Sequence, residues 1–305
     1  MASPLGVVVM AYGTPASPED IEAYYTHIRR GRSPSAEQLA DLTARYDAIG
    51  GSSPLAARTE AQRATLARAL DEQAPGQSMV VLGQKHAAPF IEDAVAALAG
   101  AGIERVVGLV LAPHFSRFSV GQYQDRLATA ATEHGMRAVG IASWHLEPAY
   151  LAFLIDVVRN GLIGMPERTK VLFTAHSLPE RALVDDPYPD QLHESAAAVA
   201  EAAGLNRWAG WSLCWQSAGR TPEPWRGPDI LQVLRELAAT GRAEGVLVCP
   251  QGFVSDHLEV IYDLDIAARG VAEDLGLAFG RTRVLNDMPS MFDALAQRVL
   301  AAAPE

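Results

Sequence analysis

Cysteine is almost absent from the 305-residue chain, which contains only Cys214 and Cys249. Two cysteines cannot build a disulfide framework, nor a zinc or iron–sulfur site that needs four thiolates. Both lie within apolar stretches, so we expect two buried free thiols. The low count is typical of a reducing compartment, and we expect a cytoplasmic location.

Positively charged residues are also few: the chain has 25 lysines and arginines and 36 aspartates and glutamates, which gives a net charge of −11. This balance disfavours nucleic-acid binding and a polybasic membrane patch. No stretch approaches the roughly 18 uncharged apolar residues of a membrane span, and the N-terminus lacks the basic and apolar segments of a signal peptide. We therefore expect neither a membrane span nor a signal peptide. The chain is long enough for a globular protein of two domains.

Short apolar runs alternate with long alanine-rich stretches along the chain. The runs are continuous, as in strands covered on both faces, and the stretches between them have helical character. This pattern predicts a doubly wound α/β fold with parallel sheets. The expected strands cover residues 6–11, 79–82, 106–111, 138–142, 171–174, 208–214 and 245–249.

The two halves of the sequence repeat a pattern. Val7-Val-Val-Met-Ala-Tyr12-Gly-Thr-Pro15 and Val171-Leu-Phe-Thr-Ala-His176-Ser-Leu-Pro179 each contain an apolar strand, an alanine, one chemically active residue and, three positions later, a proline. A second pair of similar segments, 109–116 and 247–253, recurs in the same order. The repetition predicts two similar domains, residues 1–147 and 148–305.

Tyr12 and His176 stand just beyond the first strand of each half. Ligands of open α/β sheets bind outside the carboxyl ends of the strands, so we expect both residues to face a shared central cleft. A neutral imidazole at His176 can ligate a borderline metal or accept a proton near neutral pH. The alternative is a loop histidine with a structural hydrogen bond.

An acidic segment follows the strand expected at 245–249. On an α-helix, Asp256, Glu259 and Asp263 would share one face, which suits a divalent cation. The alternative is a solvated helix face capped by Ser255 or Asp256. One histidine and one carboxylate make an incomplete metal site, which suits an ion that is passed on better than a structural zinc.

Three arginines, Arg29, Arg30 and Arg32, end an aromatic helical stretch, and Arg45-Tyr46 and a glycine–serine turn at 50–54 follow. Guanidinium groups bind carboxylates through two parallel hydrogen bonds, so the cluster predicts an anion pocket. The alternative is that the arginines complement a helix C-terminus. Neither a P-loop nor a G-x-G-x-x-G turn is present to support nucleotide binding.

Other candidates favour ordinary structural roles. We expect His86 and His114 to be loop histidines with satisfied hydrogen bonds, with lining of the cleft as the alternative. Trp211, Trp215 and Trp225 are expected to pack the second domain. No G-x-S-x-G turn supports a serine hydrolase.

Together these segments resemble the ferrochelatase family, and within it the short, soluble coproporphyrin III ferrochelatases of Gram-positive-type bacteria. The resemblance covers roughly residues 5–300 and depends on the order and spacing of long strings. These are Met10-Ala-Tyr-Gly-Thr-Pro15, Tyr24-Tyr-Thr-His-Ile-Arg-Arg-Gly31, Ala48-Ile-Gly-Gly51, Leu111-Ala-Pro-His-Phe-Ser116, Ala175-His-Ser-Leu-Pro-Glu180, Asp186-Pro-Tyr-Pro-Asp-Gln-Leu-His-Glu-Ser195, Trp215-Gln-Ser217 and Ser255-Asp-His-Leu-Glu-Val260.

The resemblance implies a chelatase-like fold of two Rossmann-like domains around a porphyrin cleft. It places His176 and Glu259 on the metal-insertion side, in the second domain, with Asp263 behind Glu259. Tyr12 matches a tyrosine that ligates iron axially from the opposite face. Most porphyrin contacts fall in the first domain, at positions matching Tyr12, Arg29, Arg45, Tyr46, Ser53 and Tyr123.

The implied activity is insertion of Fe(II), as substrate, into coproporphyrin III in haem biosynthesis. The resemblance further implies a monomer without an iron–sulfur cluster, and handover of the product to haem-pathway enzymes. Alternatives are a protoporphyrin IX ferrochelatase, a chelatase for another metal or tetrapyrrole, and a non-catalytic haem-binding or delivery protein. The residues leave open whether His176 or Glu259 takes the pyrrole protons. Short family members often carry a further acid where this chain has Ala267, so an acidic relay is not implied here.

Overall fold

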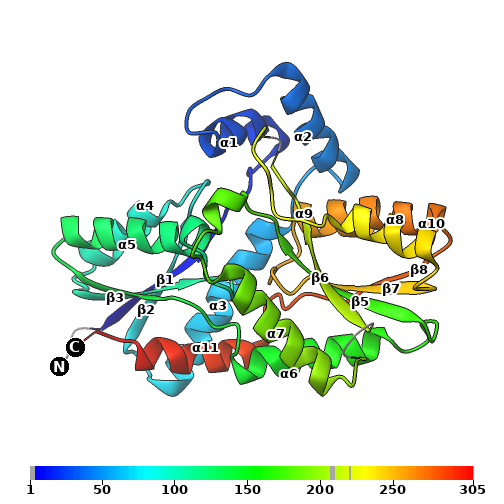
Figure 1. The fold of residues 1–305 in the computed structure, drawn as a ribbon. Helices are drawn as coiled ribbons and strands as arrows, with labels where there is room; N and C mark the ends of the chain where they lie inside the picture. Colours follow the sequence, from blue (N-terminus) through cyan, green and yellow to red (C-terminus); the bar gives the residue numbers. More distant parts are fainter. Residues whose placement is uncertain (1–3, 207–209, 220, 305) are drawn as a thin grey trace. The chain divides into compact units, whose positions relative to one another are not determined.

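The chain folds into two compact units, each built on one parallel sheet of four strands (Figure 1). Unit 1 comprises Met1–Ala112, Phe118–Ser143 and Asn286–Glu305, and unit 2 comprises Pro113–Arg117 and Trp144–Leu285. The structure is a computed structural model that describes residues 4–206, 210–219 and 221–304. Among these residues, no helix is both long and apolar enough to cross a membrane.

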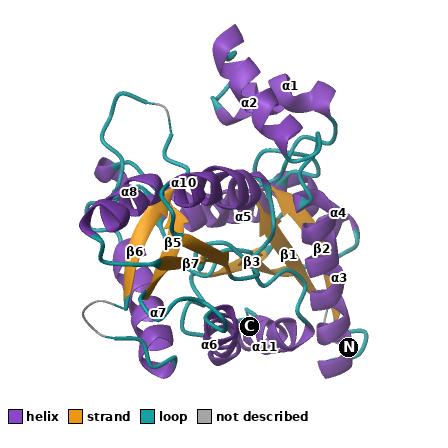
Figure 2. Ribbon diagram, turned by 90° about the vertical axis from the view of Figure 1, so that its right-hand side faces the viewer, coloured by secondary structure: helices purple, strands orange, loops and turns teal. Residues whose placement is uncertain are grey.

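Unit 1 has the strand order β2-β1-β3-β4, with every residue of the central strand β1 buried. Helices α4 and α5 pack together on one face of the sheet, and α3 and α11 pack together on the other (Figure 1). Helices α1 and α2 pair with each other and stand apart from the sheet (Figure 2). The elements are β1 (Leu5–Ala11), α1 (Ile21–Ile28), α2 (Ala36–Ala48), α3 (Leu55–Gln73), β2 (Ser78–Gln84), α4 (Ile91–Gly100), β3 (Arg105–Val110), α5 (Gln122–Glu133), β4 (Arg137–Ile141) and α11 (Pro289–Ala301).

Unit 2 repeats this topology with the strand order β6-β5-β7-β8, so β5 takes the place of β1. Helices α6 and α7 pack together, as do α8 and α10, and the two pairs lie on opposite faces of the sheet (Figure 1). The elements are α6 (Pro148–Gly161), β5 (Thr169–His176), α7 (Tyr188–Ala202), β6 (Trp211–Gln216), α8 (Ile230–Thr240), β7 (Gly245–Cys249), α10 (Arg269–Asp274) and β8 (Ala278–Arg281).

Both units also contain a π-helical segment after their third strand. η2 (Arg117–Gly121) leads into α5, whereas η4 (Ile261–Ala268) connects the short α9 (Leu258–Val260) to α10. Two 3₁₀ turns, η1 (Pro18–Asp20) and η3 (Glu180–Ala182), complete the described helices. π-helical turns are rare and occur often at functional sites. We therefore expect functional residues at the strand ends beside these two segments.

The helix that follows the last strand of each sheet packs in the other unit. Helix α6 follows β4 in the chain but packs in unit 2 against α7, and α11 follows β8 but packs in unit 1 against α3. Since α3 and α7 occupy equivalent places, the two packings are equivalent. The second segment expected from the sequence, 148–305, therefore differs from unit 2 in its last 20 residues, which complete unit 1.

The predicted α/β fold with two similar parallel sheets is confirmed. All seven expected strands are present, although residues 208 and 209 of the sixth lie outside the described part of the chain. β8 was not expected from the sequence, because this short strand is half-buried and has no continuous apolar run. Cys214 and Cys249 are buried free thiols, as expected, and burial raises the pKa of Cys249 to about 12.

Candidate functional site

His176 is the last residue of β5 and stands at the carboxyl end of the sheet in unit 2. Its Nδ1 lies within hydrogen-bond distance of the Ser177 carbonyl oxygen, so Nδ1 carries the proton that it donates there. This tautomer leaves Nε2 facing the Glu259 carboxylate, with 3.5 Å between Nε2 and Oε1. The loop after β7 comes close to the same strand end because Gly252 has no side chain: a Cβ there would lie 2.6 Å from the Cβ of Ala175.

Glu259 lies in α9, directly before the π-helical segment, and contacts a second histidine. The Nε2 of His257 lies 3.6 Å from Oε2 of Glu259, and its Nδ1 lies 2.9 Å from the Ser255 carbonyl oxygen. One carboxylate is therefore flanked by two imidazoles, each presenting Nε2. His257 was not expected from the sequence, because its contact with Glu259 depends on the extended backbone of His257 (φ −159°, ψ −179°).

The electrostatics of His176 and Glu259 are coupled. Burial alone would lower the pKa of His176, but the adjacent Glu259 carboxylate, the Ser177 carbonyl and Asp263 raise it to about 9. Burial would raise the pKa of Glu259, but His176 and His257 hold it well below its usual range. About a third of each side chain remains exposed, so both can meet a substrate. The pair offers a carboxylate for a cation and an imidazole that exchanges a proton.

The expectation of three acids on one α-helical face is wrong. Asp256 precedes the helix and faces Arg281, with 3.5 Å between Oδ1 and Nη1. Asp263 lies in the π-helical segment, where the i→i+5 hydrogen bonds change the angular spacing of side chains. Its carboxylate accepts a hydrogen bond of 2.5 Å from the Ser217 hydroxyl. No three His, Cys, Asp or Glu side chains among the described residues form a group that could hold a metal ion.

In unit 1, Tyr12 follows β1 and is 42% exposed. The backbone N–H of His86, which follows β2, donates to the Tyr12 carbonyl oxygen (2.9 Å), and the two ring centroids lie 4.6 Å apart. The Nδ1 atoms of His86 and His27 lie 3.0 Å apart and share one hydrogen bond. Burial, then Lys85 and then His27, lowers the pKa of His86 to about 3, so this imidazole is neutral at pH 7.

Lys85 contributes a partly desolvated cation to the same strand end. Burial, with the nearby Arg126 and Arg30, lowers the pKa of Lys85 to about 8. Its Nζ donates to Oε1 of Gln122 (2.7 Å) and lies 5.0 Å from the ring centroid of Tyr123. Tyr123 is buried, and burial raises the pKa of its phenol.

The other residues proposed to hold a porphyrin lie at the end of α1, on α2 and just before α3. Arg29 ends α1, with its guanidinium carbon 5.6 Å from the Tyr25 ring centroid. In α2, Nε of Arg45 lies 3.2 Å from Oδ2 of Asp41. Tyr46 is buried with its hydroxyl 3.3 Å from Oγ1 of Thr14, and the Ser53 hydroxyl accepts a hydrogen bond of 3.2 Å from the backbone N–H of Leu55.

His114 has a structural partner, as expected, since its Nε2 lies 2.9 Å from the Ser195 hydroxyl in the buried interior of unit 2. Trp215 is buried, and Trp211 packs against Phe173 with the ring centroids 5.8 Å apart. The indole N–H of Trp225 donates to the Thr221 hydroxyl (2.8 Å).

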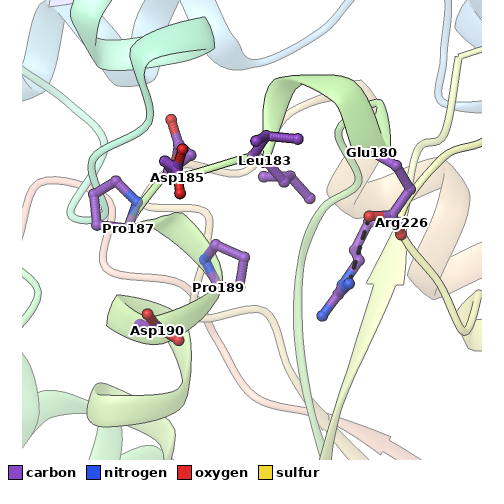
Figure 3. A pocket seen from close by; sticks show the side chains of 9 residues that line it. Glu180, Leu183, Asp185, Pro187, Pro189, Asp190 and Arg226 are labelled. Carbon is purple, nitrogen blue, oxygen red and sulfur yellow. Dashed lines mark hydrogen bonds and ion pairs between the residues drawn. The ribbon is translucent and has the colours of Figure 1, made fainter.

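A surface pocket of about 590 Å³ lies in unit 2 beside η3 (Figure 3). Its wall combines Leu183, Val184 and two prolines with four carboxylates, and Arg226 lies 3.5 Å from the Glu180 carboxylate. None of the predicted site residues lines it. Because an acidic wall repels anionic ligands, we assign the candidate site to the strand ends and not to this pocket.

Comparison with known proteins identifies close relatives across the whole chain. The sequence model of the family described as Ferrochelatase matches residues 4–303. The coproporphyrin III ferrochelatase of Bacillus subtilis is 46% identical over 303 residues, covering 97% of each protein. That of Anoxybacillus flavithermus is also 46% identical over 303 residues and covers 97% of this chain and 95% of the relative.

Solved structures with a similar fold include SirB and CbiX, both of low sequence identity. SirB from Bacillus subtilis with Fe³⁺ has a TM-score of 0.59 at 11% identity, covering 98% of this chain and 95% of SirB. CbiX, described as the terminal enzyme for biosynthesis of siroheme in denitrifying bacteria, has a TM-score of 0.53 at 16% identity, covering 98% and 99%. These structures confirm the predicted chelatase-like fold.

Proposed function

Because the chain belongs to the ferrochelatase family, we propose that it inserts Fe(II) into coproporphyrin III and forms Fe-coproporphyrin. The relatives named for this substrate are 44–46% identical over nearly the whole chain. The observation that carries the proposal is the His176–Glu259 pair, which places an ionised carboxylate 3.5 Å from an imidazole at a strand end. This pair has the two groups that insertion needs, a ligand for the metal and an acceptor for protons.

Insertion replaces the two pyrrole N–H protons of the porphyrin with one Fe(II) ion. With a pKa of about 9, His176 is protonated at neutral pH while Glu259 is ionised. We propose that Fe(II) first meets the Glu259 carboxylate and that its positive charge favours loss of the proton from Nε2 of His176. The neutral imidazole then accepts a pyrrole proton as the Fe–N bonds form, passes it to water and accepts the second.

The residues of unit 1 would bind and orient the porphyrin. Arg29 and Arg45 would pair with its carboxylates, which fixes the ring for insertion. Tyr12 would ligate the iron of the product through its phenol oxygen, as tyrosine does in some haem proteins. Tyr46, Ser53 and Tyr123 would line the same region. Coproporphyrin III carries four carboxylates and protoporphyrin IX two, so the arginines favour the former.

We propose that the enzyme acts as a monomer in the cytoplasm, without an iron–sulfur cluster, and that it passes Fe-coproporphyrin to a later enzyme of haem biosynthesis. Sedimentation of the purified protein, with and without product, tests the monomer.

The test of the function is anaerobic Fe(II) insertion, followed through the Soret and Q bands, with coproporphyrin III and protoporphyrin IX side by side. We expect turnover on coproporphyrin III that His176→Ala abolishes while porphyrin binding persists. Turnover mainly on protoporphyrin IX would contradict the substrate, and insertion by His176→Ala at the parent rate would contradict the assigned residue.

The exposed Tyr12 side chain favours a second candidate, a haem-binding or delivery protein that uses this phenolate as an axial ligand. The His176–Glu259 pair argues against it, because a carrier needs no proton acceptor. Tight binding of finished haem without insertion of any metal would establish the carrier.

A further inference from the structure

Ser217 has an unusual backbone conformation at the edge of the candidate site. It directly follows β6 and has φ +60°, a left-handed conformation that is uncommon for residues other than glycine. Its hydroxyl donates a hydrogen bond of 2.5 Å to Oδ2 of Asp263. The backbone conformation therefore aims the serine hydroxyl at one carboxylate of the π-helical segment.

The residue before Ser217 fixes the same loop. Gln216 is buried, and its carbonyl oxygen accepts a hydrogen bond of 2.8 Å from the backbone N–H of Ser177, next to His176. Its side chain accepts from the Thr174 hydroxyl (2.8 Å) and donates to the carbonyl oxygen of Glu259 (3.0 Å). Gln216 thus joins the end of β5 to α9. Ser217 adds a second connection, from the same loop to Asp263 in the π-helical segment.

We propose that Ser217 is a positioning residue for the metal: its hydroxyl holds the Asp263 carboxylate where it helps attract Fe(II) to Glu259. This rests on the proposed function. The π-helical segment has two acids: Asp265 is paired with Arg281 (2.7 Å between Oδ1 and Nε), whereas Asp263 is held by Ser217. A left-handed serine costs stability, and such strain typically persists where it serves a function. Asp263 also lies close enough to His176 to contribute to its raised pKa.

Three substitutions separate the hydroxyl from the backbone strain. Ser217→Gly removes the hydroxyl and relieves the strain, because glycine adopts positive φ freely. Ser217→Ala removes the hydroxyl and keeps the strain. Ser217→Asn keeps a hydrogen-bond donor in a residue that tolerates this conformation. The matched control is Asp185→Gly, since Asp185 is another left-handed residue of unit 2 (φ +54°) and lies outside the candidate site.

The experiment measures KM for Fe(II), KM for coproporphyrin III, kcat and the melting temperature of each variant. We expect Ser217→Gly and Ser217→Ala to raise KM for Fe(II) about tenfold, as for loss of one charge-assisted hydrogen bond. KM for the porphyrin should stay within about twofold, with the melting temperature of Ser217→Gly unchanged. Ser217→Asn should recover most of the metal affinity, and Asp185→Gly should leave the kinetic constants unchanged.

A double substitution links the effect to Asp263. Asp263→Asn should raise KM for Fe(II), as Ser217→Gly does. The double variant should have a KM for Fe(II) no higher than that of Asp263→Asn, because both changes remove the same Ser217–Asp263 interaction. Additive effects would overturn the proposal, as would an unchanged KM for Fe(II) in Ser217→Gly. A parent enzyme that inserts no iron would refute the proposed function itself, whereas an active parent with an unaffected Ser217→Gly refutes only the role of Ser217.

Discussion

The carboxyl ends of the two sheets carry opposite electrostatic environments on the same topology. In unit 1, Tyr12 follows the central strand and His86 follows its neighbour, with Lys85 adjacent; in unit 2, His176 ends the central strand and faces Glu259. Burial and Lys85 lower the pKa of His86 to about 3, whereas Glu259 raises that of His176 to about 9. The fold therefore determines where an active side chain stands, and the neighbouring charges determine its protonation and the ligand that it suits.

This difference matches the two substrates of the proposed reaction. A neutral imidazole beside a lysine and several arginines suits the carboxylates of a porphyrin, whereas an ionised carboxylate beside a protonated imidazole suits a cation that displaces a proton. We therefore expect substitutions in unit 2 to affect metal insertion, and substitutions in unit 1 to affect porphyrin binding. Three predictions test this separation.

The largest effect is expected for Glu259→Gln, which removes the negative charge beside His176 and leaves the size of the side chain nearly unchanged. The variant loses the metal ligand and lowers the pKa of His176 toward its ordinary value, so kcat for Fe(II) insertion should fall by at least about 100-fold. Affinity for coproporphyrin III, measured by fluorescence quenching, should stay within about twofold. Glu180→Gln, a glutamate of the surface pocket in the same unit, is the control and should keep full activity. A Glu259→Gln rate above a tenth of the parent rate would contradict the assignment.

A smaller effect is expected for Arg29→Met, which removes one guanidinium from unit 1 and keeps an unbranched side chain. Loss of one charge-assisted contact to a porphyrin carboxylate should raise KM for coproporphyrin III about tenfold. KM for Fe(II) should not change, which is the reverse of the result expected for Ser217→Gly. Arg68→Met, on α3 and paired there with Glu72, is the control. Equal changes in both KM values would show that Arg29 supports the fold and not the porphyrin.

Much of the fold is predictable from the sequence, because buried parallel strands produce continuous apolar runs such as 7–10 and 171–175. The equivalence of Tyr12 and His176 was also predictable, since the repeated sequence pattern places each residue at the end of the first strand of its half. The packing of α11 in unit 1 was not predicted, although this helix carries a stripe of buried apolar residues. Local pattern does not specify which partner covers such a stripe.

The candidate site was less predictable than the fold, for reasons of geometry. His176 was predicted from its place after a strand and Glu259 from helical spacing, and the resemblance joined the two as a pair. The spacing that grouped Asp256 and Asp263 with Glu259 fails, because Asp256 precedes the helix and Asp263 lies in the π-helical segment. His257 and Ser217 act through backbone conformations, extended at one and left-handed at the other. Neither residue type signals such a conformation, so these contacts emerge only from the three-dimensional structure.

The smallest expected effect is on stability as a function of pH, and it has opposite signs in the two units. The folded-state pKa of His176, about 9, exceeds its ordinary value of about 6.5, so its contribution is complete below pH 6.5 and is lost as the pH rises to 9. The pKa of His86, about 3, is below that value, so its contribution is complete above pH 6.5 and is lost as the pH falls toward 3.

The measurement is the melting temperature of the parent, His176→Asn and His86→Asn between pH 4 and 9. The parent-minus-variant difference should shrink toward high pH for His176→Asn and toward low pH for His86→Asn, each by on the order of 2 °C. Because carboxylates elsewhere titrate equally in parent and variant, they cancel in this difference. If the difference in melting temperature shrank toward the same end of the pH range for both variants, the two strand ends would not differ in charge as the structure indicates.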